Sequence, residues 1–298
     1  MTSGSVTGSV RSLQAAVRDA VQALSIAGID SAEFDAVALA AHVLRTTPSE
    51  VRKQMVMGAS APDGLDDLVA ERARRVPLQH LTGKAGFRRL DLSVGPGVFV
   101  PRFETELVAG LAISHLQSDS GSRGRGPSPL VVDLCTGSGA IALAIKDEVP
   151  TAEVHGVELS DLAHAWAIRN RDDLGLDVDI RLGDATLAFP DLEAAVDVVA
   201  SNPPYIPVGS VPNDPEVRDH DPEVALYGGS SDGLRIPLEV AARAAVLLRA
   251  GGFFVMEHAD VQGDSLPTAL WATGVWQDIQ DHNDLNGRPR AVTAVRAH

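Results

Sequence analysis

The sequence predicts an α/β domain, built around a seven-stranded and mostly parallel sheet, that follows a small all-helical domain. Two observations support this fold class. Between residues 11 and 81 the apolar residues recur only at helical spacing. From residue 130 onward, short apolar runs alternate with helical stretches, which is typical of a parallel sheet with helices on both faces. The length of 298 residues favours two domains, at roughly 150 residues each.

The amino-terminal part predicts four helices. The first ends near Gly28 and turns an apolar face inward, consisting of Leu13, Val17, Val21 and Leu24. The second is capped by Asp30 or Ser31, and we expect it to bury Phe34, Val37, Ala38, Ala41 and Leu44. The third starts at a capping box in which Thr47 is the N-cap, Pro48 the first helical residue and Glu50 the reciprocal partner. The fourth follows the turn at residues 62–64 and carries Leu65, Leu68, Val69, Ala73 and Val76.

The composition then changes along the chain. We expect a disordered tail over residues 1–10, the helical domain over 11–81, a hairpin linker over 82–100 and the α/β domain over 101–298. Periodicity predicts a helix over 104–117. The Gly/Ser/Pro-rich stretch 118–129 has almost nothing to bury, so we expect it to be a mobile surface loop.

Seven short apolar runs predict the strands of the sheet: 130–134, 153–158, 178–182, 196–201, 251–258, 274–280 and 289–296. Helical stretches fill the gaps at 139–148, 161–174, 233–249 and 260–272. No helical stretch separates the last two strands. We therefore expect these two strands to form an antiparallel pair at one edge.

Composition narrows the function classes. The chain has 40 acidic and 25 basic residues and a net charge of −15, which disfavours non-specific binding of nucleic acid. A single cysteine excludes an internal disulfide and favours a reducing compartment. No apolar run approaches the roughly 18 residues that span a bilayer, and the first residues do not resemble a signal peptide. We expect a cytoplasmic monomer that contacts neither membranes nor nucleic acid directly.

The first candidate site is the segment DLCTGSGA, residues 133–140. It follows an apolar strand directly and opens a helix, a placement that lets the backbone approach a ligand at the helix N-terminus. Its alternative is a tight strand-to-helix turn without a ligand. The residues expected to hold a cofactor here are Cys135, Thr136, Gly137, Ser138 and Gly139.

Acidic residues follow the next two strands. Glu158 ends the second strand, about 20 residues beyond the glycine loop, where a carboxylate commonly accepts hydrogen bonds from a ribose. Asp184 and Ala185 end the third strand at the same edge. Asp184 can accept a hydrogen bond from an adenine amino group, and its alternative role is a helix cap. Together these features predict a nucleoside-containing cofactor.

The segment SNPPYIP, residues 201–207, ends the fourth strand. Pro203 and Pro204 donate no backbone hydrogen bonds and hold the chain extended. Some carbonyls here can therefore face a ligand. The Asn202 side-chain oxygen and the Pro203 carbonyl can accept both hydrogens of a planar NH2 group, and Tyr205 adds a flat face. The segment predicts a site for a planar group that carries an NH2.

Taken together, DLCTGSGAIALA, VELS and SNPPYIP resemble the class I S-adenosylmethionine-dependent methyltransferases that act on planar nitrogens. Five further segments resemble the HemK/PrmC family of release factor glutamine methyltransferases. They are PLQHLTG (77–83), FVPRFETE (99–106), DPEVALYGG (221–229), EHADVQG (257–263) and DLNGRPR (284–290). The resemblance runs from about residue 11 to residue 296.

This resemblance implies a Rossmann-like methyltransferase domain, S-adenosylmethionine as cofactor, and methylation of the glutamine in the Gly-Gly-Gln motif of peptide chain release factors. Asn202, Pro203 and Tyr205 are then the catalytic residues, and Asn202 also borders the cofactor. Phe103, Asn202, Pro203, Pro204 and Tyr205 are expected to bind the substrate. The helical domain is expected to hold the release factor away from the reacting atoms.

Two departures from the family pattern stand out. Cys135 replaces the usual glycine, and Phe103-Glu104 stand where family members often have Pro-Asp. Cys135 is small, and no histidine or other base lies beside it in the sequence. We therefore expect it to support the cofactor loop and not to act as a nucleophile.

Other functions also fit parts of the pattern. A ribosomal-protein glutamine methyltransferase carries similar motifs, and an adenine-amino nucleic acid methyltransferase shares the Asn-Pro-Pro-Tyr tetrad, although this acidic chain lacks a Lys/Arg-rich stripe. A non-catalytic nucleotide-binding adaptor would not need the tetrad. The nine histidines form no ligand-spaced pair with another histidine or the cysteine, so we expect no metal.

Overall fold

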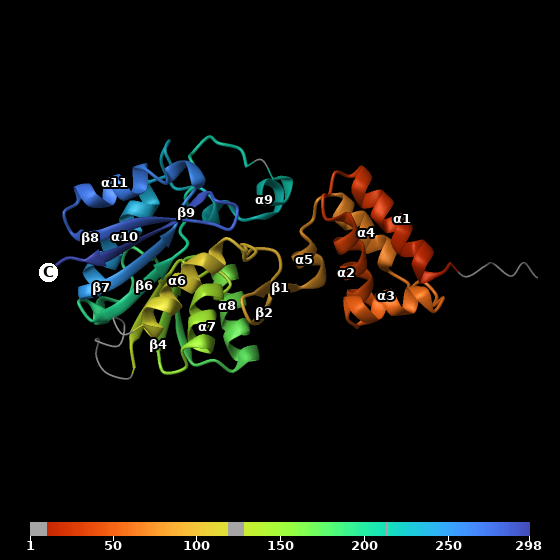
Figure 1. Cartoon of the computed structure of the whole chain (residues 1–298), viewed down its shortest axis with the longest axis horizontal. Coiled ribbons are helices and arrows are strands. Elements are labelled where there is room, and N and C mark those ends of the chain that lie inside the picture. Colours follow the sequence, from red (N-terminus) through yellow and green to blue (C-terminus); the bar gives the residue numbers. More distant parts are fainter. Residues whose placement is uncertain (1–10, 119–127, 213) are drawn as a thin grey trace, which may run out of the picture. The chain divides into compact units, whose positions relative to one another are not determined.

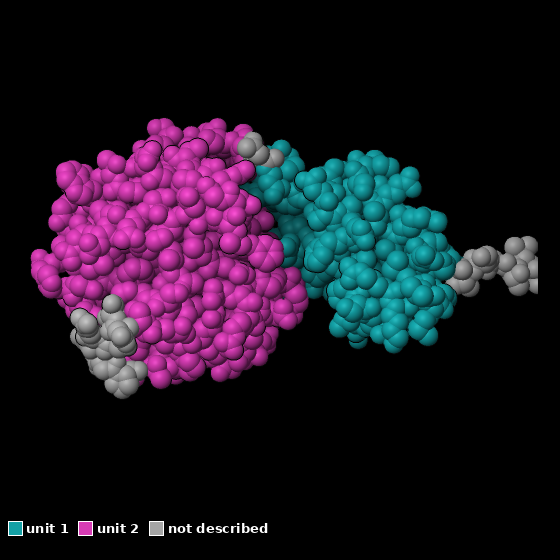
Figure 2. Space-filling model, in the orientation of Figure 1, with its two compact units in different colours: residues 1–83, 213–220 teal, residues 84–212, 221–298 magenta. Residues whose placement is uncertain are grey.

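The computed structural model describes residues 11–118, 128–212 and 214–298. The chain divides into two compact units (Figure 2), of which one comprises residues 1–83 and 213–220 and the other residues 84–212 and 221–298. We call them the helical unit and the α/β unit. The expected tail at 1–10 and most of the expected loop at 118–129 lie outside the described residues.

The helical unit is built from six helices in the described residues, because its apolar residues recur at helical spacing. They are α1 (Leu13–Ile26), α2 (Ala32–Leu44), α3 (Pro48–Val56), α4 (Leu65–Ala73), α5 (Leu78–Thr82) and α9 (Pro215–His220). Thr47 caps α3 as predicted, since its Oγ1 accepts a hydrogen bond from the Glu50 N–H at 3.2 Å. The α9 segment was not expected in this unit, because its sequence lies within the α/β domain.

The predicted inward face of α2 is wrong at Phe34, whose side chain is 62% exposed. The buried face includes Asp35, which is only 2% exposed. Asp35 accepts hydrogen bonds from Arg72 Nε at 2.7 Å and from Ser31 Oγ at 2.9 Å. An apolar-only pattern missed this face, because a carboxylate paired with a buried arginine occupies part of it.

The α/β unit begins with the antiparallel hairpin of β1 (Lys84–Phe87) and β2 (Leu90–Ser93), followed by α6 (Thr105–Gln117). The main sheet has the strand order β5-β4-β3-β6-β7-β9-β8. Its strands are β3 (Leu130–Leu134), β4 (Glu153–Glu158), β5 (Val178–Leu182), β6 (Val196–Ser201), β7 (Leu248–Glu257), β8 (Trp276–Asn283) and β9 (Pro289–Arg296). The first five of these are parallel, and β8 and β9 form the expected antiparallel pair. The predicted fold class is confirmed.

Helices cover both faces of the sheet (Figure 1). On one face lie α6, α7 (Ala140–Glu148) and α8 (Asp161–Leu174), and on the other lie α10 (Arg235–Leu247) and α11 (Ser265–Ala272). Successive residues of β3 serve the two cores, since Val131 packs in the first and Val132 in the second. Burial on both faces explains why the central strands are continuous apolar runs.

Some boundaries differ from those expected. The predicted helix over 260–272 is a short 3-10 turn at Asp260–Gln262 followed by α11, because Gly263 separates them. Strand β7 begins three residues before the predicted 251, and β8 ends three residues after the predicted 280. Further 3-10 turns lie at Pro190–Leu192 and Glu223–Ala225. In the described part of the chain, no helix combines the length and apolar character needed to cross a membrane.

Candidate active site

The parallel strands bring the predicted site residues to one edge of the sheet. Strands β3 to β7 run in the same direction, so their carboxyl ends meet where open α/β sheets bind ligands. The residues that end or follow them are the loop 135–139 after β3, Glu158 on β4, Asp184 after β5, Asn202 after β6 and Glu257 on β7.

The loop after β3 has a left-handed backbone at three positions. Cys135 has φ +66°, Gly137 φ +58° and Gly139 φ +86°. A side chain in this region costs roughly 1–2 kcal/mol, so Cys135 occupies a position that favours glycine. A Cβ on Gly139 would also lie 2.9 Å from Leu143 Cδ1, whereas a Cβ on Gly137 would meet open space. Gly137 thus leaves room for a ligand beside the backbone.

Glu158 is bonded directly to this loop. Its Oε2 accepts the Gly137 N–H at 2.8 Å and its Oε1 accepts the Ser160 N–H at 2.9 Å. A carboxylate offers about four lone-pair sites, so each oxygen retains one for the hydroxyls of a ribose. The structure therefore brings together the two features that predicted a nucleoside site.

Asp133 lies beneath the loop and was not among the predicted contacts. It is 0% exposed, and its Oδ2 accepts hydrogen bonds from Thr136 Oγ1 at 2.6 Å and from the Ala142 N–H at 3.1 Å. Burial raises the pKa of Asp133 to about 7, although these two hydrogen bonds lower it. Its Oδ1 is buried without a hydrogen-bond partner among the described residues. The sequence feature that points to Asp133 is its position near the end of a buried strand, directly before the glycine loop.

The Cys135 thiol is poorly suited to nucleophilic chemistry. Burial and the neighbouring charges of Glu158 and Asp133 raise the pKa of this thiol, so the reactive thiolate is disfavoured. Cys135 is partly buried and packs against the core on the face of the sheet that α10 and α11 cover.

At the end of β5 the two predicted residues differ in setting. Asp184 is exposed, and its Oδ1 accepts hydrogen bonds from the Thr186 N–H and the Thr186 Oγ1, both at 2.8 Å. These bonds close the turn over residues 185–187, and no helix begins there, so the alternative role of Asp184 as a helix cap is wrong. Ala185 is 7% exposed and packs in the core, and its contact with the cofactor stays a prediction.

The loop after β6 is held by contacts from several distant segments. Ser201 Oγ donates to the Leu134 carbonyl at 2.6 Å, which ties this loop to the glycine loop. Asn202 Nδ2 donates to Thr105 Oγ1 at 3.1 Å. Among the described residues, no hydrogen bond reaches Asn202 Oδ1 or the Pro203 carbonyl. These are the two acceptors predicted to face the substrate.

Tyr205 is fixed at both ends. Its hydroxyl donates to Glu257 Oε1 at 2.9 Å, and its carbonyl accepts from Gln262 Nε2 at 3.0 Å. Burial beside Glu257 raises the pKa of the Tyr205 phenol, so the phenol keeps its proton and acts as the donor. The sequence predicts no role for Glu257 or Gln262, although both lie in the segment EHADVQG that contributed to the family resemblance.

Gly233 lies against the Tyr205 backbone. Its φ is +74°, and a Cβ there would lie 2.1 Å from the Tyr205 carbonyl oxygen. Glycine is therefore required for the loop to take this path.

Residues 99–106 contribute to the same edge through Thr105, at the start of α6. Arg102 pairs with the buried Asp221 at 2.8 Å, which joins two of the segments that carried the family resemblance. Phe103 is 81% exposed. Its contact with the substrate stays a prediction, and Pro204 is half-buried.

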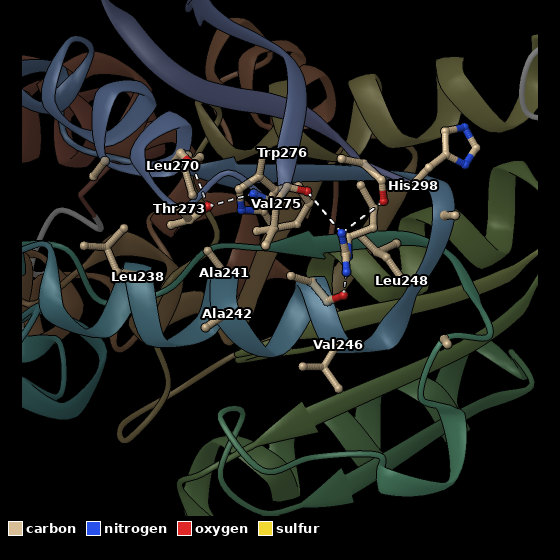
Figure 3. Close-up of a pocket in the computed structure, with 16 residues that line it drawn as sticks. Leu238, Ala241, Ala242, Val246, Leu248, Leu270, Thr273, Val275, Trp276 and His298 are labelled. Atoms are coloured by element: carbon tan, nitrogen blue, oxygen red, sulfur yellow. Dashed lines mark hydrogen bonds between the residues drawn. The ribbon is translucent and has the colours of Figure 1, made fainter.

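A pocket of about 560 Å³ lies elsewhere in the α/β unit (Figure 3). Its lining includes Leu248 at the start of β7, Trp276 at the start of β8 and Ala194 shortly before β6. These residues lie at the opposite end of the parallel strands from the predicted site. The lining is mainly apolar, and we assign this pocket no part in the reaction.

The carboxyl edge of the sheet fits the nucleoside part of S-adenosylmethionine. It offers a glycine backbone with open space beside Gly137 and a carboxylate, Glu158, with unused lone pairs. In the described part of the chain no group of three or more His, Cys, Asp or Glu side chains could hold a metal ion.

Comparison with known proteins identifies the family. The family described as PrmC N-terminal domain matches residues 15–83, and the Methyltransferase small domain matches residues 89–211. The release factor glutamine methyltransferase of Streptomyces coelicolor is 48% identical, with 96% of this chain and 98% of that protein covered. The protein of the same name from Bifidobacterium longum is 40% identical, with 94% and 98% covered.

Another relative carries a different name. The 4-amino-L-phenylalanine/4-methylamino-L-phenylalanine methyltransferase of Streptomyces pristinaespiralis is 38% identical, with 98% of both chains covered. Five further relatives, 39–42% identical over 94–95% of this chain, carry the name release factor glutamine methyltransferase. The resemblance seen in the motifs is confirmed, and the chain belongs to the release factor glutamine methyltransferase family.

Proposed function

We propose that this protein transfers a methyl group from S-adenosylmethionine to the side-chain amide nitrogen of the glutamine in the Gly-Gly-Gln motif of peptide chain release factors. The observation that carries the proposal is the orientation of Asn202. Its Nδ2 is engaged by Thr105, which leaves Oδ1 as an acceptor at the carboxyl edge of the sheet, beside the Pro203 carbonyl.

The cofactor, when bound, supplies the electrophilic methyl group. The chain holds it through Glu158, whose carboxylate accepts the ribose hydroxyls, and through the backbone of residues 135–139. Because Gly137 N–H is bonded to Glu158, the ribose acceptor and the loop form one unit.

Asn202 and Pro203 orient the substrate amide. An amide nitrogen is a poor nucleophile because its lone pair is delocalised into the carbonyl. When both amide hydrogens are accepted, by Asn202 Oδ1 and the Pro203 carbonyl, the plane of the amide is fixed and positive charge on its nitrogen is favoured. Alignment of this kind supplies several kcal/mol. Tyr205 provides the flat surface on which the amide rests. The proton lost by the nitrogen passes to water, because Glu257 is buried and bonded to Tyr205.

A panel of acceptors tests the substrate. The enzyme and S-adenosylmethionine labelled in the methyl group are incubated separately with purified release factor, ribosomal protein and DNA. We expect label in the release factor alone. Label in the ribosomal protein or the DNA, with none in the release factor, would overturn the proposal.

A second candidate acceptor is an aromatic amine, because one relative at 38% identity is named for methylation of 4-amino-L-phenylalanine. An aromatic NH2 is also planar and offers two hydrogens to Asn202 and Pro203. Adding 4-amino-L-phenylalanine to the panel separates the two candidates. Its labelling at a higher kcat/KM than the release factor would favour the second.

We further propose that the helical unit holds the release factor. A chain that begins at Thr82 should still bind the cofactor but methylate intact release factor poorly, with a raised KM. Full activity on the intact factor would contradict this role.

We expect the enzyme to act as a monomer in the cytoplasm without binding nucleic acid. Light scattering of the enzyme alone tests whether it is a monomer, and light scattering with DNA tests whether it binds DNA.

A further inference from the structure

Two buried side-chain amides hold the two loops of the site with the same pattern of hydrogen bonds. Gln262, in the 3-10 turn after β7, is 2% exposed, and Asn170, on α8, is 1% exposed. The proposed reaction uses neither of them. A buried amide is costly unless hydrogen bonds compensate it, so its partners indicate what it does. We call residues 201–207 the acceptor loop and residues 135–139 the glycine loop.

The Gln262 amide is bonded to three backbone groups. Its Nε2 donates to the Tyr205 carbonyl at 3.0 Å and to the Asp232 carbonyl at 2.9 Å, and its Oε1 accepts from the Ala259 N–H at 2.9 Å. Two of these partners can only accept and the third can only donate, so the amide has one orientation. A Cβ at Gly233 would lie 2.9 Å from Gln262 Nε2 and 2.1 Å from the Tyr205 carbonyl oxygen. Glycine at this position thus leaves the space in which the two groups meet.

The Tyr205 carbonyl is a fixed point near one end of the acceptor loop. At the other end, Ser201 Oγ donates to the Leu134 carbonyl at 2.6 Å. Between these points lie Pro203 and Pro204, whose rings restrict the backbone angles. The Pro203 carbonyl therefore moves together with the Tyr205 peptide. By holding the Tyr205 carbonyl, Gln262 holds the carbonyl that is proposed to accept from the substrate amide.

Asn170 makes the same kinds of hydrogen bond at the glycine loop. Its Nδ2 donates to the Ser138 carbonyl at 2.9 Å and to the Ser93 carbonyl at 3.0 Å, and its Oδ1 accepts from the Ser93 N–H at 2.6 Å. Ser138 directly follows Gly137, whose N–H is bonded to Glu158. Asn170 therefore holds the side of the site that is expected to bind the cofactor.

We propose that Gln262 and Asn170 are positioning residues with separate tasks. Gln262 fixes the acceptor loop for methyl transfer, and Asn170 fixes the glycine loop for cofactor binding. The hydrogen bonds that the described residues make to these two amides share no partner, so the two tasks can be perturbed independently. The task of Gln262 rests on the proposed function, because it concerns the rate on the release factor, whereas the task of Asn170 concerns cofactor binding alone.

Matched isosteric changes separate the two tasks. Gln262→Glu and Asn170→Asp each replace the NH2 group by an oxygen, so a donor to two carbonyls becomes an acceptor. In Gln262→Glu we expect kcat on the release factor, at saturating S-adenosylmethionine, to fall about tenfold, the effect of one net hydrogen bond on a rate. The Kd of S-adenosylhomocysteine should change less than about twofold. In Asn170→Asp we expect the reverse, with this Kd raised about tenfold and kcat at saturating cofactor within about twofold of the wild type.

A second pair of variants avoids a new buried carboxylate. Gln262→Met and Asn170→Leu keep the approximate shape of the side chain and remove all three hydrogen bonds, and we expect the same separation of kcat from Kd. Asp197→Asn is the control for loss of stability, since Asp197 is 3% exposed but lies at the other end of β6. It should lower Tm and leave both kcat and Kd unchanged. All rates are measured below the lowest Tm of the set.

A purely structural role would lower Tm without separating the two readouts. Wild-type kcat in both Gln262 variants, wild-type Kd in both Asn170 variants, or equal changes of kcat and Kd in all four would overturn the inference while the proposed function stands. If the wild-type enzyme leaves the release factor unlabelled, the proposed function fails and the task of Gln262 fails with it. The Kd of the Asn170 variants then still decides the task of Asn170.

Discussion

Replacing Glu158 by alanine should weaken cofactor binding by about 10- to 100-fold. The carboxylate accepts the Gly137 N–H at 2.8 Å and the Ser160 N–H at 2.9 Å, and we expect its remaining lone pairs to accept from the ribose hydroxyls of the cofactor. Loss of a hydrogen bond to a charged acceptor costs about 1.5–3 kcal/mol, and each 1.4 kcal/mol is about tenfold in Kd. Glu158 is half-exposed, so in the alanine variant water can bind the two backbone N–H groups in its place. The expected loss of affinity therefore includes only the contact with the ribose.

Glu158→Gln should have an intermediate effect. The glutamine side chain offers one acceptor oxygen and one NH2 group, so either Gly137 N–H or Ser160 N–H then faces a donor. The glutamine oxygen can still accept a hydrogen bond from the ribose, but it carries no negative charge. The expected order of Kd is therefore wild type, then glutamine, then alanine.

Calorimetric titration with S-adenosylhomocysteine measures these differences. Glu153→Ala is the matched control, because Glu153 begins the same strand at the opposite end and its side chain is 65% exposed. Its Kd should equal that of the wild type. If Glu158→Ala binds within about twofold of the wild type, then Glu158 does not hold the ribose and the assignment of the edge is wrong.

Three other variants test separate parts of the structure. Asn202→Ala should lower kcat by about 100-fold, as when one preorganised contact to developing charge is removed, and Asn202→Asp should retain more activity because it still accepts; equal loss in both would show that acceptance is not what Asn202 contributes. Gly233→Ala should lower both Tm and kcat while cofactor binding persists, because its Cβ would lie 2.1 Å from the Tyr205 carbonyl; an unchanged kcat would mean that the loop tolerates the shift. Burial raises the pKa of Glu216, but Asp214, Arg72 and Arg75 outweigh it and lower the pKa to about 2. Ionised Glu216 therefore stabilises the fold above its usual pKa of 4.5, and this contribution disappears as the pH falls toward 2. Glu216→Gln should lower the free energy of unfolding by about 1–3 kcal/mol at pH 7, and the difference from wild type should vanish near pH 2; a pH-independent difference would exclude the ion pairs as its cause.

The fold could be predicted largely from the sequence, because its elements are encoded locally. Continuous apolar runs marked the buried strands, and strand polarity then placed Glu158 and Asn202 at one edge. The capping box at Thr47 was also local. Phe34 was misplaced because the buried face of α2 includes Asp35, whose partner Arg72 lies 37 residues away.

The missed parts of the site depend on contacts between distant segments. Thr105 meets Asn202 across 97 residues, and Tyr205 meets Glu257 across 52 residues. No spacing rule predicts such pairs, although the motifs that contain them carried the family resemblance. For the same reason the sequence did not place residues 213–220 with the helical unit, since the pairing of Glu216 with Arg72 spans 144 residues.

The measurement that tests the central claim most directly is the position of the transferred methyl group. Release factor is incubated with the enzyme and S-adenosylmethionine, digested, and sequenced by tandem mass spectrometry. The account predicts one added methyl on the side-chain amide nitrogen of the Gly-Gly-Gln glutamine, and its absence when Asn202→Ala enzyme is used at equal concentration. A methyl group on any other residue of the release factor, or an unmodified glutamine after full incubation with the wild-type enzyme, would contradict it.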